Sequence, residues 1–151
     1  MYMIKNPKQN PSIAIVASEY HKEIVDSLVT NCVDTLVEAD VAREDIKLVR
    51  VPGALEIPLT AQKLATAGNF DAIIVFGIIL RGDTYHFEQV SNECARGCID
   101  VGLKTGVPVI FQVLSVNSIK DAIERAQGTT GNRGVEGART ALKMVSILNN
   151  L

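Results

Sequence analysis

Residues 72–80, with the sequence AIIVFGIIL, form the longest apolar run of the chain. An apolar run without polar alternation is typical of a strand that is buried on both faces, as in a parallel sheet. The run is far shorter than the roughly 20 residues that a membrane-spanning helix needs. The polar turn Arg81-Gly82-Asp83-Thr84 follows at once. We therefore predict a central strand that ends at this turn.

Strand and helix patterns alternate outward from this run on both sides. The predicted strands are 12–18, 46–51, 72–80 and 107–114, and the predicted helices are about 24–37, 54–67, 87–101, 118–126 and 135–145. Such alternation predicts a parallel sheet with helices on both faces and right-handed crossovers. We expect a single flavodoxin-like α/β domain over residues 1–151, with three α/β/α layers and a four-stranded sheet in the order 2-1-3-4. Residues 1–11 are expected to be a loose N-terminal segment.

The composition excludes several classes of protein. The chain has 151 residues, 47% of them hydrophobic, and a net charge of −2, so it lacks the broad basic surface of a general nucleic-acid binder. Its three cysteines cannot form a paired disulfide framework. The N-terminal sequence MYMIKNPKQNP has no apolar core of signal-peptide length. We expect a cytoplasmic protein that does not bind a membrane.

Both histidines of the chain lie where ligands bind in open α/β sheets, beyond the carboxyl ends of the strands. His21 follows the first strand beside Tyr20, and His86 follows the third strand beside Tyr85. A helix N-terminus disfavours a protonated imidazole, so His86 is suited to accept and donate protons. The alternative is a surface histidine without a role.

The turn Gly82-Asp83-Thr84 precedes the same predicted helix. Free backbone N–H groups at a helix start form a natural anion site. The alternative is that Asp83 or Thr84 simply caps the helix.

Other motifs give less support for a function. Neither GxGxxG nor GxxxxGK[ST] is present, so a dinucleotide or nucleoside triphosphate is not indicated. Glycines recur every third residue from Gly128 to Gly137, which indicates a flexible connection between two helices. Cys94 and Cys98 stand one helical turn apart on an apolar stripe, so we expect buried thiols and no metal site.

Five segments carry the signature residues of one enzyme family in the family's own order. They are VPGALEIP at 51–58, GIILRGDTYHFE at 77–88, GVPVIF at 106–111, AIERA at 122–126 and GNRG at 131–134. Through these segments the chain resembles the lumazine synthases over about residues 12–148. The resemblance implies condensation of 5-amino-6-(D-ribitylamino)uracil with 3,4-dihydroxy-2-butanone 4-phosphate, with loss of phosphate and water, and without a cofactor or metal.

The same resemblance implies roles for individual residues. His86 would carry protons, Tyr20 would stack on the pyrimidine, and Phe111 would come from a neighbouring subunit to close the pocket. The pyrimidine and ribityl pocket would be lined by Ala54, Leu55, Glu56, Ile78, Ile79 and Leu80. The phosphate would be held by Asp83, Thr84 and Arg125. Tyr20 stands where the family usually has Phe or Trp, Ile78 where Thr is common, and His21 where Asn is frequent.

The family resemblance also implies an assembly. Lumazine synthases form pentamers, and in some cases twelve pentamers close into an icosahedral shell, with riboflavin synthase as a candidate partner. The loop 127–134 carries no insertion, which favours the shell.

Two other functions remain open from the sequence. The first is a non-catalytic flavin- or lumazine-binding protein on the same scaffold, for which His86 and Arg125 would be unnecessary. The second is a flavodoxin-like signalling module, which would need an acidic cluster at the first strand end. Ser18-Glu19-Tyr20 supplies a single carboxylate there.

Overall fold

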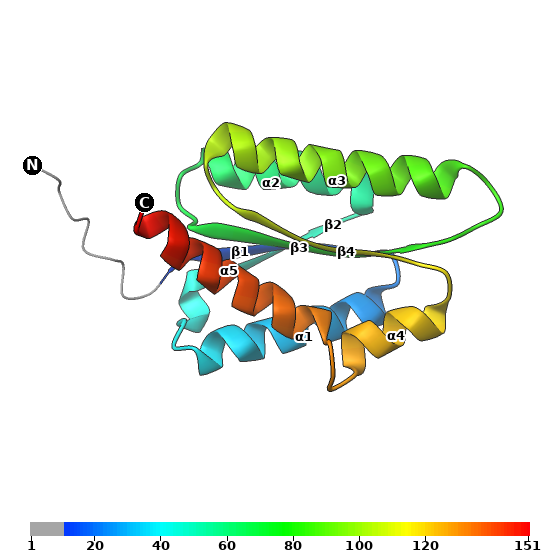
Figure 1. Ribbon diagram of the computed structural model, residues 1–151, viewed down its shortest axis with the longest axis horizontal. Coiled ribbons are helices and arrows are strands. Elements are labelled where there is room, and N and C mark those ends of the chain that lie inside the picture. The colour runs from blue at the N-terminus through cyan, green and yellow to red at the C-terminus, as the bar shows by residue number, and fades with distance from the viewer. Residues whose placement is uncertain (1–10) are drawn as a thin grey trace, which may run out of the picture.

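The computed structural model describes residues 11–151, and its centre is one four-stranded, all-parallel sheet in the order β2-β1-β3-β4 (Figure 1). The strands are β1 (Ile13–Ser18), β2 (Ile46–Val51), β3 (Ala72–Leu80) and β4 (Val109–Val116). The predicted flavodoxin-like α/β fold and its strand order are confirmed. The expected loose segment 1–11 lies outside the described residues except for Pro11.

Helices cover both faces of the sheet. The helices are α1 (Lys22–Glu38), α2 (Ile57–Thr66), α3 (His86–Thr105), α4 (Ile119–Gln127) and α5 (Arg133–Asn149). In Figure 1, α2 and α3 lie on one face, and α1, α4 and α5 lie on the other. β3 contributes side chains to the core on both faces of the sheet. Ile74 and Phe76 are buried beneath α1 and α5, and Ile73 and Val75 are buried beneath α2 and α3. This two-sided burial is why β3 is a continuous apolar run.

Several predicted boundaries were wrong: those of β4, the start of α2, and the ends of α3 and α5, which lie at Thr105 and Asn149. β4 runs from Val109 to Val116, two residues later at each end than predicted. Pro108 has no N–H to give to the ladder, and its carbonyl instead accepts from Ile73 N at 2.9 Å. Ser115 extends the strand although it is polar, because its side chain lies on the exposed edge. The predicted helix 54–67 begins as a 3-10 turn, η2 (Ala54–Glu56), and α2 follows it.

The prediction of a flexible glycine-rich connection was wrong for its second half. Gly134 and Gly137 lie inside α5. A Cβ at Gly134 would lie 2.3 Å from the carbonyl oxygen of Leu28 on α1. A Cβ at Gly137 would lie 3.2 Å from the side chain of Ile74 on β3. These glycines let α5 approach α1 and the sheet more closely than any side chain would allow.

The cysteines are buried side chains of the core, as predicted. Cys94 and Cys98 face the sheet from α3, and burial raises the pKa of Cys32 to about 12. Within residues 11–151, no three His, Cys, Asp or Glu side chains gather as a metal site would require. No helix in that same range is long and apolar enough to span a membrane.

Candidate active site

A cavity of about 510 Å³ opens at the carboxyl edge of the sheet, on the side covered by α3. This volume is in the range of small-molecule sites. Its wall is built by the ends of β1 and β3, by η2 and by the first turn of α3. The lining residues are Tyr20, His21, Gly53, Ala54, Leu55, Glu56, Ile78, Ile79, Leu80, Arg81, Gly82, Thr84, His86, Phe87 and Val90. All the predicted site residues except Asp83, Phe111 and Arg125 are in this set.

The apolar wall comes from two elements that meet at the cavity. Ile78, Ile79 and Leu80 end β3, and Phe87 with Val90 stands on the first turns of α3. Phe87 and Val90 fall within the predicted helix 87–101, but they were not predicted as site residues. Their three-residue spacing directly after the turn was the signal that they face the carboxyl edge. This part of the cavity wall is therefore apolar, which suits contact with an uncharged ring.

Tyr20 and His21 form the turn between β1 and α1. The Tyr20 side chain is 68% exposed, and its ring meets that of His21 edge to face at 5.0 Å. His21 has a left-handed backbone, with φ of 54°, and its carbonyl accepts from the N–H groups of Ile24 and Val25 at 3.1 Å. Histidine is one of the few non-glycine residues enriched in this region. Glu19 N donates to Val51 O at 2.8 Å and so ties the turn to β2.

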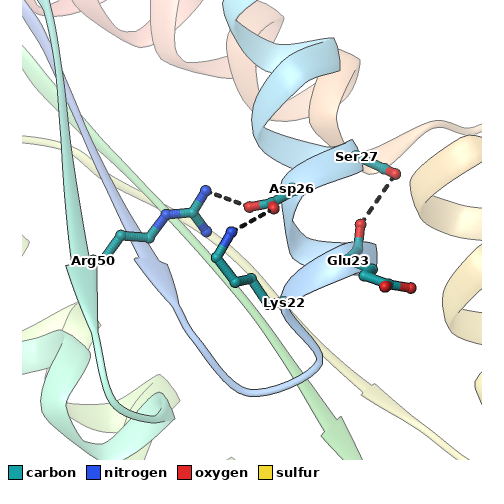
Figure 2. A network of polar contacts seen from close by, with 5 residues as sticks. All are labelled: Lys22, Glu23, Asp26, Ser27 and Arg50. Carbon is teal, nitrogen blue, oxygen red and sulfur yellow. Dashed lines mark hydrogen bonds and ion pairs between the residues drawn. The ribbon is translucent and has the colours of Figure 1, made fainter.

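An ionic network holds the start of α1 against β2 behind this turn (Figure 2). Asp26 accepts from Lys22 Nζ at 2.8 Å and pairs with Arg50 of β2. The hydrogen bond from Lys22, with the charge and hydrogen bond of Arg50, lowers the pKa of Asp26 against the opposing effect of burial. The residues that carry Tyr20 are thus fixed from two sides, by a backbone hydrogen bond and by an ion pair.

The end of β2 brings a carboxylate to the cavity. Gly53 precedes η2, and a Cβ at Gly53 would lie 3.1 Å from Oε2 of Glu56. The Glu56 side chain therefore folds back toward Gly53 at the cavity wall. Its acceptor oxygens suit the hydroxyl groups of a polyol ligand.

The end of β3 brings an imidazole and a helix start to the same cavity. His86 is the first residue of α3, and the residue before it, Tyr85, makes no side-chain cap. The alternative that Asp83 or Thr84 caps this helix was wrong. Thr84 and His86 line the cavity, whereas Asp83 is exposed outside it. Uncapped N–H groups can bind an anion, and the imidazole beside them can exchange protons with a ligand held there.

Phe111 and Arg125 lie away from this cavity in their own chain. Phe111 pairs with Val75 of β3, five residues before Leu80, and so lies about 16 Å from the carboxyl edge. Arg125 is exposed on α4, on the opposite face of the sheet, and donates to the carbonyl of Asp121 at 3.2 Å. Neither side chain completes the cavity of its own subunit.

The fold and cavity define a flavodoxin-like α/β protein with a small-molecule site, in which an imidazole stands beside an uncapped helix start. The family model described as 6,7-dimethyl-8-ribityllumazine synthase matches residues 10–149 of the 151-residue chain. The chain therefore belongs to the 6,7-dimethyl-8-ribityllumazine synthase family. This family places it among transferases of riboflavin biosynthesis that act on small molecules and assemble as oligomers.

Proposed function

We propose that the protein condenses 5-amino-6-(D-ribitylamino)uracil with 3,4-dihydroxy-2-butanone 4-phosphate to 6,7-dimethyl-8-ribityllumazine, releasing phosphate and water. The observation that carries this proposal is that a single cavity gathers an exposed aromatic ring, an apolar wall, a carboxylate, an imidazole and an uncapped helix start. Each of these groups matches one part of the two substrates.

The pyrimidine binds against the apolar wall beside Tyr20. The exposed Tyr20 ring offers a π face to a planar heterocycle, and Ile78 to Leu80 exclude water from its edge. The ribityl chain extends toward Glu56, whose carboxylate accepts from the hydroxyl groups. The Tyr20 hydroxyl adds a polar group that Phe would lack.

His86 moves the protons of the reaction. Schiff-base formation between the amine and the ketone, and the later ring closure, each need proton transfer, which one imidazole serves in turn. Its place at the cavity wall supports this role. Holding the two substrates face to face removes much of the entropic cost of their condensation.

The phosphate binds at the start of α3, beside Thr84. Elimination of phosphate leaves negative charge at the leaving group, which helix N–H groups and a guanidinium stabilise. Asp83 lies outside the cavity, so its contribution is through the backbone of the turn. The guanidinium is supplied by Arg125 of a neighbouring subunit, because Arg125 is far from the cavity of its own chain.

A ring of identical subunits satisfies this requirement. A head-to-tail contact brings the β4 edge, with Phe111 and α4, against the open cavity of the next subunit. We propose a pentamer on this basis, and the uninserted loop 127–134 favours twelve pentamers in a closed shell, with riboflavin synthase as a partner. Light scattering tests the assembly, since particles that stay at pentamer mass in all buffers would contradict the shell.

The activity is tested by mixing both substrates with the purified protein and recording the absorbance of the lumazine. Product formation that depends on protein and on both substrates supports the proposal. A protein that binds the lumazine but never forms it would instead be a non-catalytic binding protein. Failure to bind either substrate would favour the signalling module.

A further inference from the structure

Arg81 joins the end of β3 to the turn that carries Thr84 and His86. Its backbone N–H donates to Val116 O at 2.8 Å, which places it level with the end of β4. Its side chain lines the cavity and is 54% exposed. Residues 81–86 are all exposed, so little packing fixes the path of this turn.

The Arg81 guanidinium contacts three side chains on two other elements. Nε donates to Oδ1 of Asn117, in the connection between β4 and α4, at 3.0 Å. Nη1 lies 3.6 Å from Oε1 of Glu88, and the guanidinium carbon lies 4.8 Å from the centre of the Phe87 ring. Phe87 and Glu88 directly follow His86 in the first turn of α3.

We propose that Arg81 is a positioning residue that clamps the first turn of α3 to the β4–α4 connection and so fixes His86 at the cavity. This inference rests on the proposed function, in which His86 transfers protons. The guanidinium donates from two nitrogens in its plane, to Asn117 and toward Glu88, while its flat face packs on the Phe87 ring. A lysine ammonium cannot make these contacts together. The helix start needs such an external clamp because no side chain caps it.

The first test is Arg81→Lys, which keeps the charge and removes the fork. Displacement of a general acid–base group lowers kcat by roughly 10- to 100-fold, while the KM for the pyrimidine changes little. Arg96→Gln is the control, because Arg96 lies on α3 beyond its first turn, is exposed, and pairs with Glu93 and Asp100. An Arg81→Lys enzyme with an unchanged kcat would overturn the proposal.

A double-mutant cycle with His86→Ala separates positioning from a direct role. If Arg81 acts through His86, Arg81→Lys has no further effect on the residual activity of His86→Ala. If both changes multiply, Arg81 acts independently of His86, and the proposal is wrong. Asn117→Ala serves as a second variant should Arg81→Lys fold poorly, since it removes one of the three contacts.

Hydrogen–deuterium exchange tests the clamp without substrates. Faster exchange in the peptide covering 81–90 is expected in Arg81→Lys but not in Arg96→Gln. Unchanged exchange in that peptide would contradict the clamp even if activity fell. If the unaltered protein forms no lumazine, the proposed function fails, while this measurement still decides whether Arg81 orders the turn.

Discussion

The turn after β1 and the turn after β3 both line the cavity but are held in different ways. The first, Glu19 to His21, is bonded to β2 through its backbone and is backed by the Asp26–Arg50 ion pair (Figure 2). The second, residues 81–86, is exposed throughout and leads into a helix without a side-chain cap. One wall of the cavity is therefore built into the sheet, and the other depends on side-chain contacts.

This difference matches the division of labour that we propose. Stacking of a substrate ring needs mainly a rigid aromatic surface, and the β1 turn supplies one in Tyr20. Proton transfer needs an imidazole placed within a few tenths of an ångström, and phosphate binding needs free N–H groups. The β3 turn leaves those N–H groups free because no side chain caps the helix. The turn is therefore less firmly fixed, and we propose that the contacts of Arg81 compensate for this.

The largest effect is expected from the β3 side. His86→Ala should lower kcat by roughly 10²-fold or more, the usual range for a lost general acid–base group, while the pyrimidine still binds. Steady-state kinetics with both substrates measure the rate, and fluorescence titration measures pyrimidine binding.

Gln89→Ala is a suitable control, because Gln89 is exposed on the same helix and does not line the cavity. Undiminished turnover of His86→Ala would show that this imidazole has no part in the reaction. The β3 turn would then have only a binding role.

The second largest effect is expected at Arg125, which we propose reaches the phosphate from a neighbouring subunit. Arg125→Ala should raise the KM for the phosphate substrate by roughly 10- to 100-fold, because a charge-assisted contact to phosphate is lost. Arg139→Ala provides a control for removal of an exposed arginine on the neighbouring helix. An unchanged KM would remove Arg125 from the phosphate site.

Complementation then decides whether the site is shared. Refolding equal amounts of His86→Ala and Arg125→Ala chains together leaves about a quarter of the sites in a mixed ring with both groups intact. Activity well above that of either variant is expected. Activity that stays at the level of the separate variants, in verified mixed rings, would mean that one chain builds the whole site.

The sequence predicted the strands and their order better than it predicted contacts between distant segments or between subunits. The apolar run 72–80 defined β3 to the residue, because burial on both faces leaves no other pattern. Gly134 and Gly137 were misjudged because only the tertiary contacts of α5 show that they replace side chains. Arg81 could be seen as a charge at a strand end, but its hydrogen bond to Asn117 joins segments that are distant in sequence. Phe111 and Arg125 cannot be placed in a site from one chain alone, since the proposed contact crosses subunits.

A smaller effect is expected from the β1 side. Tyr20→Ala should weaken pyrimidine binding by roughly tenfold, from about 1.5 kcal/mol of lost stacking, and leave phosphate binding unchanged. Tyr20→Phe, which keeps the ring, should bind the pyrimidine nearly as well as Tyr20. Calorimetric titration with each ligand tests this, and equal weakening of both ligands by Tyr20→Ala would contradict a stacking role.

The smallest effect should come from the ion pair behind that turn. Asp26 is 38% exposed, so solvent screens its attraction to Arg50 and Lys22, and Asp26→Asn should cost less than about 1 kcal/mol of stability. The pKa of Asp26 is lowered on folding, so its contribution is present above the unfolded pKa of about 3.9 and disappears as the pH falls through the lower folded pKa. Thermal unfolding at a fixed protein concentration should thus separate the two proteins at pH 7, and the difference should shrink as the pH falls below about 3.9. Asp34→Asn, at an exposed position of the same helix, gives the baseline.

Pyrimidine binding should change little in Asp26→Asn, because the bond from Glu19 to Val51 still holds the turn. A large loss of binding would mean that the ion pair, and not the backbone, keeps Tyr20 in place.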